Sequence, residues 1–486
     1  MGANEGLEQC RVHVESLLRD RGHSGLRKTS YPSGSLGFLE QCDEVVTIAD
    51  DIRKAQAQLN VIVVGAGLGG LATAIALRRR GHQVTVFERA PKLDEVGAGI
   101  QIPPNSTRIL LKFGLGSHLL KHATRPDSIR FRRWETGEVI GCTKLIPEFE
   151  TRFGAPYYVM HRANLQLSLY QVALELGVSV LLNAGVKTYD QKTPSIQLDD
   201  GTIHKADLIV AADGIKSEAR RVVLGGSDQP PCKAGFAAYR AMVEVEKMSG
   251  DAELEELLRI PGQNLWVGNQ RHVMTYTVAG GKYFNMVLSH PEDEDPGDWN
   301  QKTVVEDMKA NFQGWDPCLV KVIDLIEKTQ KWPLLTGTPL PRWVSSSGKL
   351  LIIGDAAHAM VPYMSAGAAM AVEDGAALAE VLSLIGSTRE MQRALEIFQT
   401  VRISRTGQMQ EASLVNGKIW HFEDGPEQRA RDESMRNDCG GDGIRSSANQ
   451  WSDAETSRWA YGYDAEEQVR RAWKEDTKQR RPGSNL

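Results

Sequence analysis

The sequence predicts an α/β fold in which a parallel sheet is interleaved with a second, mostly antiparallel sheet. A strand–turn–helix–strand pattern with clustered glycines occupies residues 59–88. Apolar and polar residues alternate over much of 235–340, which is the period of strands with one buried face. A last apolar strand at 349–353 is followed by a helix rich in small residues. The chain is therefore expected to return to the first sheet after building the second.

The composition is that of an ordinary soluble globular protein. The 486 residues exceed a usual single domain, and the formal charge of -5 with no basic stripe argues against a nucleic-acid partner. The longest apolar stretches, such as 59–64 and 366–372, are far shorter than the roughly 18 residues that span a bilayer. We expect no integral membrane segment. Six dispersed cysteines without a CxxC pair or a secretory signal predict an intracellular, cytoplasmic protein.

We expect two main domains with an extension at each end. The first domain is split in sequence, and its second part ends in a long helix. The expected segments are an N-terminal extension at 1–58, the first domain at 59–234, the β-sheet domain at 235–340, the rest of the first domain at 341–420, and a tail at 421–486. The tail is polar, but tryptophans predict that it packs on the body. They are Trp420, Trp451, Trp459 and Trp473.

The glycine-rich turn after the first strand predicts a dinucleotide site. Gly65, Gly67 and Gly70 fill the glycine places of G-x-G-x-x-G between a strand and a helix, and Glu88 closes the next strand. Glycine lets the backbone approach a pyrophosphate, and the helix N-terminus offers free N–H groups. Glu88 can accept hydrogen bonds from ribose hydroxyls. The unit is therefore predicted to be a Rossmann-like binding domain, with an ordinary glycine-rich turn as the alternative.

Two later strands also end beside an acidic residue. The strand at 207–212 runs into Asp213, and the strand at 349–353 runs into Asp355. In this order and spacing the motifs resemble the flavoprotein aromatic hydroxylases typified by salicylate and hydroxybenzoate hydroxylases, and most closely the fungal-type flavoprotein monooxygenases. The resemblance covers about 59–475. It implies a para-hydroxybenzoate hydroxylase-like fold and FAD as the cofactor.

The resemblance also implies which residues contact the cofactor, with the ADP part of FAD on the glycine-rich turn and the acid after it. Gly99 lies in a segment that resembles the stretch beside the flavin ring, and Arg162 matches an arginine that touches FAD. Asp213 matches an Asp-Gly motif associated with FAD and the nicotinamide cofactor. Asp355 matches the acid that binds the ribityl chain, and Ala368 lies where the next helix starts beside the flavin. No second G-x-G-x-x-G is visible, so NADPH or NADH is expected as a transient co-substrate.

Three residues are candidates for chemistry on the substrate. Tyr239 and Lys216 resemble family positions that orient and stabilise a phenolate, and His272 is a candidate base. The alternatives are a half-buried strand residue for Tyr239, a surface charge for Lys216 and a structurally bonded histidine for His272. No metal site is expected, because the helical pair His118 and His122 lacks a third ligand.

Together these features favour an FAD-dependent monooxygenase that uses NADPH or NADH and O2 to hydroxylate a small aromatic, phenolic substrate. The expected chemistry is attack by a flavin C4a-hydroperoxide on a ring activated by loss of the phenol proton. The family commonly has Gly-Gln where this chain has Ser365 and Ala366, which leaves the type of oxygenation open. The alternatives are an epoxidase or dearomatising hydroxylase of a secondary-metabolite pathway, a non-oxygenating FAD dehydrogenase or reductase, and a non-catalytic flavin-binding protein.

Overall fold

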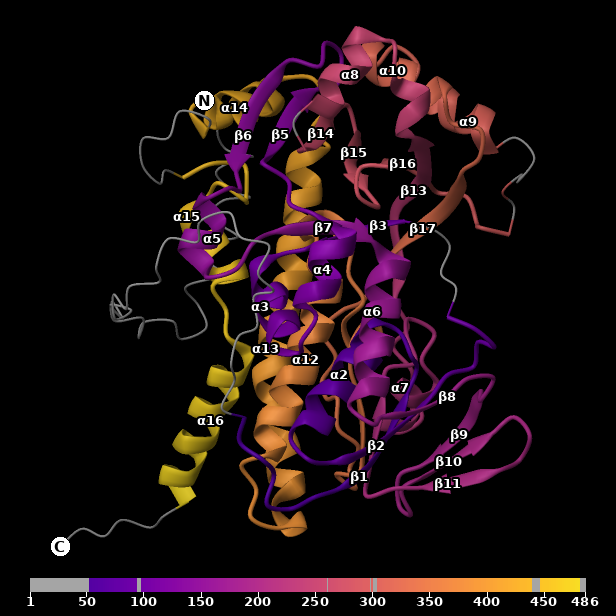
Figure 1. Cartoon of the computed structure of the whole chain (residues 1–486), viewed down its shortest axis with the longest axis vertical. Coiled ribbons are helices and arrows are strands. Elements are labelled where there is room, and N and C mark those ends of the chain that lie inside the picture. Colours follow the sequence, from indigo (N-terminus) through magenta and orange to yellow (C-terminus); the bar gives the residue numbers. More distant parts are fainter. Residues whose placement is uncertain are drawn as a thin grey trace, which may run out of the picture.

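A computed structural model describes residues 52–93, 98–259, 261–297, 299, 304–438 and 446–480. Residues 1–51, which make up most of the expected N-terminal extension, lie outside this part of the chain. The two large sheets lie toward opposite ends of the long axis, and helix α13 (Met391–Trp420) runs between them (Figure 1). No helix in the described ranges is long and apolar enough to cross a membrane.

The first large sheet is parallel throughout and carries the glycine-rich turn. Its five strands lie in the order β18-β12-β1-β2-β8. Their bounds are β1 (Asn60–Val64), β2 (Gln83–Phe87), β8 (Ser179–Leu181), β12 (Leu208–Ala211) and β18 (Leu350–Ile352). Parallel neighbours end at one edge of a sheet. The turns after β1, β12 and β18 therefore lie side by side, as the motifs predict.

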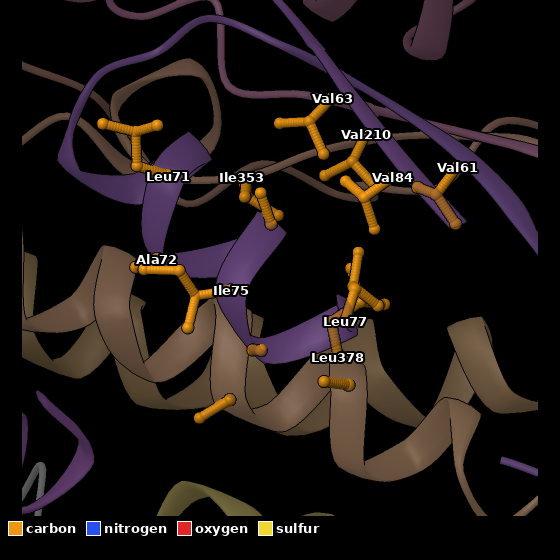
Figure 2. Close-up of a cluster of buried hydrophobic side chains, with 14 of the residues drawn as sticks. Val61, Val63, Leu71, Ala72, Ile75, Leu77, Val84, Val210, Ile353 and Leu378 are labelled. Atoms are coloured by element: carbon orange, nitrogen blue, oxygen red, sulfur yellow. The ribbon is translucent and has the colours of Figure 1, made fainter. Parts of the chain in front are cut away.

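Helix α2 (Leu68–Arg79) packs between this sheet and helix α12 (Gly367–Leu382). Figure 2 shows the resulting core, with valines from three strands facing α2, and Leu378 of α12 beneath it. The helices approach closely because α12 is rich in small residues. A Cβ on Gly375 would lie 2.8 Å from the Cα of Thr73. The close packing holds the N-termini of both helices near the sheet edge.

The second large sheet is antiparallel except for one pair of strands. Its order is β17-β13-β16-β15-β14-β5-β6, and β14 pairs with β5 in parallel. The bounds are β5 (Ser128–Arg133), β6 (Val139–Lys144), β13 (Cys232–Glu244), β14 (Gln263–Gly268), β15 (Arg271–Val278), β16 (Tyr283–Pro291) and β17 (Gln330–Thr336). Strands β5 and β6 come from the stretch that we assigned to the first domain. The sheet thus draws on two separate parts of the chain, and the domain boundaries at 235 and 341 stay predictions.

Each face of this sheet is covered by different elements. The outer face packs against α8 (Ala252–Arg259), α9 (Val304–Asn311) and α10 (Pro317–Asp324). The inner face packs against residues of α12, α13 and the C-terminal tail. Because side chains alternate along a strand, neighbouring residues of β13 and β15 belong to different cores.

The tail after α13 is folded onto the body. Helix α14 (Pro426–Met435) contacts β6, and α16 (Ala465–Arg480) packs along α12 and α13. Between them, Trp451 stacks on Trp420 with ring centroids 5.6 Å apart. The tail therefore helps to cover the inner face of the antiparallel sheet.

The remaining elements connect these layers. Two small sheets hold β3 (Gly99–Ile102), β4 (Ala123–Thr124) and β7 (Tyr158–His161), and β9 (Val186–Asp190), β10 (Ser195–Leu198) and β11 (Ile203–Lys205). The other α-helices are α3 (Pro104–Lys112), α4 (Gly116–His122), α5 (Glu148–Phe153), α6 (Arg162–Glu175), α7 (Glu218–Val223), α11 (Asp355–His358) and α15 (Ala454–Tyr461).

Candidate active site

One cavity of about 410 Å³ joins the edge of the parallel sheet to the inner face of the second sheet. Its first half is lined by backbone-rich turns, including Gly67, Gly214 and Asp355. Its second half is lined by side chains of the antiparallel sheet, including Arg240 and His272. A ligand in this cavity can therefore contact strand ends and sheet side chains at once.

The three glycines of the first turn meet different steric demands. A Cβ on Gly65 would lie 2.4 Å from the carbonyl oxygen of Ala212, and a Cβ on Gly70 would lie 2.0 Å from that of Gly65. A Cβ on Gly67 would meet nothing within 4 Å, so this position opens on the cavity. Helix α2 starts directly afterwards with no side-chain cap. Its first N–H groups are therefore left for an anion such as a pyrophosphate.

Glu88 is fixed beside this turn at the end of β2. Its carboxylate accepts hydrogen bonds from the N–H groups of Ala66 at 2.7 Å and Ala90 at 2.9 Å. Each carboxylate oxygen has two lone pairs, so the group can still accept hydrogen bonds from ribose hydroxyls. Gln166 of α6 donates to the carbonyl of Ala66 at 2.9 Å and braces the turn.

The other predicted cofactor contacts surround the same half of the cavity. Gly99, Arg162, Asp355 and Ala368 line it directly. Asp213 stands behind the wall, where its carboxylate accepts a hydrogen bond from the Tyr189 hydroxyl at 3.0 Å and one from the N–H of Ala219 at 3.3 Å. The residues on either side of Asp213 line the cavity. The tertiary structure thus gathers residues that are nearly 300 positions apart in sequence.

A buried ionic network supports the helix end at this cavity. Arg402 contacts Asp374 at 2.8 Å and Glu373 at 2.7 Å, and all three side chains are fully buried. Asp374 also accepts from the N–H of Gly354 at 3.1 Å and contacts His358 at 2.7 Å. Burial alone would raise the pKa of Asp374, but His358 and Arg402 together hold it below its usual value. The network ties the turn after β18 to the first half of α12, and the sequence analysis did not single it out.

Tyr239 faces away from the cavity, contrary to the expected contact with substrate. Its ring is fully buried under α8–α10 and stacks on His290 with centroids 4.7 Å apart. Its hydroxyl accepts a hydrogen bond from Asn311 at 3.4 Å. The neighbours Ala238 and Arg240 line the cavity instead, because alternate side chains of a strand point to opposite faces.

Lys216 is also outside the cavity wall. It lies exposed in the turn after β12, and the residue of this turn that lines the cavity is Gly214. The surface-charge alternative describes Lys216 in this structure. Neither Lys216 nor Tyr239 is therefore placed to hold a phenolate.

His272 is the candidate base that does line the cavity. Its Nδ1 lies 2.7 Å from Nε2 of His421. Burial, and then the neighbouring His421, hold the pKa of His272 well below its usual value. The imidazole is thus neutral near pH 7. With Nδ1 engaged, Nε2 is the ring nitrogen left to meet a substrate hydroxyl.

Sequence reasoning missed several side chains of the substrate half, among them Arg240, Tyr276 and Trp420. The strand alternation at 236–245 could have placed Arg240 on the face opposite Tyr239. Burial raises the pKa of Tyr276 above its usual range, so it remains a neutral hydroxyl. Nothing in the local sequence could have placed Trp420 in the same wall, because it is more than 140 positions from Tyr276.

Comparison with known proteins identifies the family. Residues 58–413 match the family described as FAD binding domain. The FAD-dependent monooxygenase OpS4 of Beauveria bassiana is 36% identical over 410 residues, covering 84% of this chain and 95% of the relative. The chain belongs to the FAD-dependent monooxygenases. FAD is its cofactor, and the suspected relationship is confirmed.

Two further matches support the relationship and the fold. The 3-hydroxybenzoate 6-hydroxylase of Polaromonas naphthalenivorans is 33% identical over 369 residues, covering 75% of this chain and 89% of the hydroxylase. The solved structure of a salicylate hydroxylase substrate complex superposes with a TM-score of 0.70 at 24% identity, covering 86% of this chain and 98% of the other. The predicted α/β fold with a sheet-rich second domain is confirmed.

Proposed function

We propose that this monooxygenase hydroxylates a small aromatic ring that carries a phenolic hydroxyl, with NADH or NADPH as electron donor and O2 as oxidant. The observation that carries the proposal is the single cavity shared by the FAD-binding turns and by His272, Arg240 and Tyr276. The name of the 33% identical relative, a hydroxybenzoate hydroxylase, supports the same substrate class.

The chain supplies a complete set of groups for an extended FAD molecule. The glycine turn and the start of α2 would hold the pyrophosphate, and Glu88 the ribose. Asp355 would accept hydrogen bonds from the ribityl chain. The uncapped N-terminus of α12, beginning at Gly367, would stabilise negative charge on a reduced flavin ring. Bound FAD supplies the transfer of electrons from NAD(P)H to O2 and of one oxygen atom to the ring.

The sheet side chains act on the substrate. Nε2 of His272 would accept the phenol proton, which makes the ring richer in electrons and more reactive toward an electrophilic oxygen. The positive charge of Arg240 favours the resulting phenolate or a ring carboxylate. Apolar side chains close the rest of the wall and exclude water from the reaction. They are Met274, Val287, Leu334 and Trp420.

The proposal is tested with the purified holoenzyme and a panel of simple phenols and hydroxybenzoates. At least one compound should accelerate NAD(P)H oxidation, and mass spectrometry should find one atom of isotope-labelled O2 in the product. Accelerated NAD(P)H oxidation with an altered but unlabelled product would instead identify a non-oxygenating dehydrogenase or reductase. If the protein binds flavin but no phenol of the panel accelerates NAD(P)H oxidation, the proposed substrate class is excluded.

A further inference from the structure

The C-terminal part of the chain supplies one residue to the wall of the substrate half of the cavity and a second residue that contacts this wall. The match to the family ends at residue 413, but α13 continues to Trp420, which lines the cavity. The next residue, His421, contacts His272. A segment outside the matched region therefore reaches the candidate base.

We infer that His421 is a positioning residue that keeps His272 ready to accept the substrate proton and passes a proton on toward the surface. The inference rests on the proposed function, because it concerns how a phenol loses its proton in this cavity. It adds a second histidine, supplied by the C-terminal segment, to the expected base.

The geometry of the pair supports a directed hydrogen bond. Nδ1 of His272 and Nε2 of His421 are 2.7 Å apart, and the two rings are stacked with centroids 5.0 Å apart. His421 also stacks on Phe236 at 4.5 Å and meets the edge of Tyr363 at 5.3 Å. Both histidines are buried, at 3% and 8% exposure. The ring of His421 is thus held between neighbours that fix its orientation.

Both imidazoles are neutral, and this limits how a proton can travel. Burial, and then the charge of Arg431, lower the pKa of His421 to about 3. A contact between two neutral imidazoles needs a single shared proton, which sits on one of the two facing nitrogens. If Nδ1 of His272 carries that proton, its Nε2 is a bare acceptor toward the substrate. The contact with His421 therefore decides whether Nε2 of His272 accepts or donates a hydrogen bond toward the substrate.

The proton transfer balances without leaving a buried charge on either histidine. The substrate O–H bond breaks, and an N–H bond forms at Nε2 of His272. The proton on its Nδ1 moves to Nε2 of His421, and the proton on Nδ1 of His421 is released to solvent. The products are a phenolate, two neutral imidazoles that each now carry the proton on Nε2 instead of Nδ1, and one proton in solution. His421 is 8% exposed, and Glu423, two residues further along the chain, is exposed, so this end of the pair lies near the surface.

Three variants separate this role from simple packing. His421→Phe keeps the stacked ring but removes the hydrogen bond. His421→Gln keeps a polar group for His272 but cannot pass a proton on. His290→Gln is the matched control, because it alters a buried histidine on the opposite face of the same sheet.

The test measures the ionisation of 4-nitrophenol as it binds to the oxidised FAD enzyme. Difference spectra report bound phenolate, and a pH-indicator dye reports proton release in stopped flow. The parent enzyme and His290→Gln should bind phenolate and release one proton per bound phenol. In both His421 variants the rate of proton release should fall at least ~10-fold, with FAD content and circular dichroism unchanged. If His421→Phe does not fold, His421→Gln alone decides.

Proton release at the parent rate in the His421 variants would overturn the inference and leave the proposed function intact. An equal loss in His290→Gln would also overturn it, because the effect would then be general loosening of the sheet. If the parent enzyme neither binds nor ionises 4-nitrophenol, and no phenol of the panel accelerates its NAD(P)H oxidation, the proposed function itself is rejected.

Discussion

At the nucleotide end of the cavity the wall consists of strand-end glycines and helix N-termini, whereas at the substrate end it consists of side chains from β13, β15 and α13. The nucleotide wall is rigid because backbone fills the space behind it, as at Gly70. The substrate wall can change by substitution without moving the backbone. One scaffold can therefore keep its cofactor while relatives named for different rings, such as hydroxybenzoate and hydroxynicotinate, vary the side chains of the substrate wall.

The largest effect is expected from breaking the ionic network behind the nucleotide end. Arg402→Met leaves Glu373 and Asp374 buried without their main cation, which should lower the free energy of unfolding by about 3–5 kcal/mol. Urea denaturation monitored by circular dichroism measures this loss. Stability close to that of the parent would mean that the nucleotide end does not depend on the network.

The second largest effect is expected on lowering the pH, which should destabilise the antiparallel sheet more than the parallel sheet. Three buried histidines lie in or against the antiparallel sheet, and their pKa values are lowered, to about 4 for His290, to about 3 for His421, and well below normal for His272. One histidine with a lowered pKa, His82 at about 4, lies beside β1 of the parallel sheet. A lowered folded-state pKa means that the unfolded chain binds more protons than the folded chain below the ordinary histidine pKa of 6.5, so stability falls as pH falls through this window. From pH 6.5 to 5.5 each histidine should cost about 1 kcal/mol.

Hydrogen exchange at the two pH values measures this difference. Amides of β15 should lose about 3 kcal/mol of protection and those of β1 about 1 kcal/mol. The half-buried His204 is not one of these four histidines and provides a control, since His204→Gln should leave both values unchanged. Equal losses at both ends would contradict the contrast.

A methyl group at the nucleotide end should have a sharply position-dependent effect. Gly70→Ala forces a Cβ against the carbonyl of Gly65 and should destabilise the protein by about 2 kcal/mol. Gly67→Ala meets open space, so the apoprotein should keep its stability while its affinity for FAD falls. Thermal unfolding of both apoproteins and FAD titration check this pair, and equal melting temperatures would show that the turn is not rigid.

At the substrate end, Arg240→Met should weaken binding rather than folding. Losing the positive charge in the cavity should raise the Kd for an anionic hydroxybenzoate about 10-fold, equivalent to about 1.4 kcal/mol. Thermal unfolding should be nearly unchanged. Quenching of flavin fluorescence measures the affinity, and a large loss of stability would show that this wall is structural as well.

The smallest effect is expected at Tyr239, one residue away on the other face of the same strand. Tyr239→Phe removes a hydroxyl that accepts one long hydrogen bond from Asn311 and should cost about 1 kcal/mol or less. Turnover should not change. A rise in the Kd for the hydroxybenzoate as great as that expected of Arg240→Met would contradict the assignment of faces.

The features that were predicted correctly share a local origin. The strand, turn and helix around Gly65 follow from neighbouring residues, and so does the strand that ends at Asp355. Their convergence followed from the rule that parallel strands end at one edge. It was harder to predict which face of β13 each side chain occupies. Strand alternation places Tyr239 and Arg240 on opposite faces, but only the packing of α8–α10 decides that Tyr239 lies on the buried outer face.

By itself the sequence determined the βαβ unit, the order of the strand-end motifs and the demand for glycine at Gly70, because these depend on contacts within a short stretch of backbone. The steric demand at Gly65 also needs β12 beside β1, because a Cβ there would meet the carbonyl of Ala212. Only the tertiary structure decided which face of β13 meets the cavity and that His421 reaches His272, 149 positions away. Such long-range pairs arise from the packing of whole elements, which no local pattern encodes.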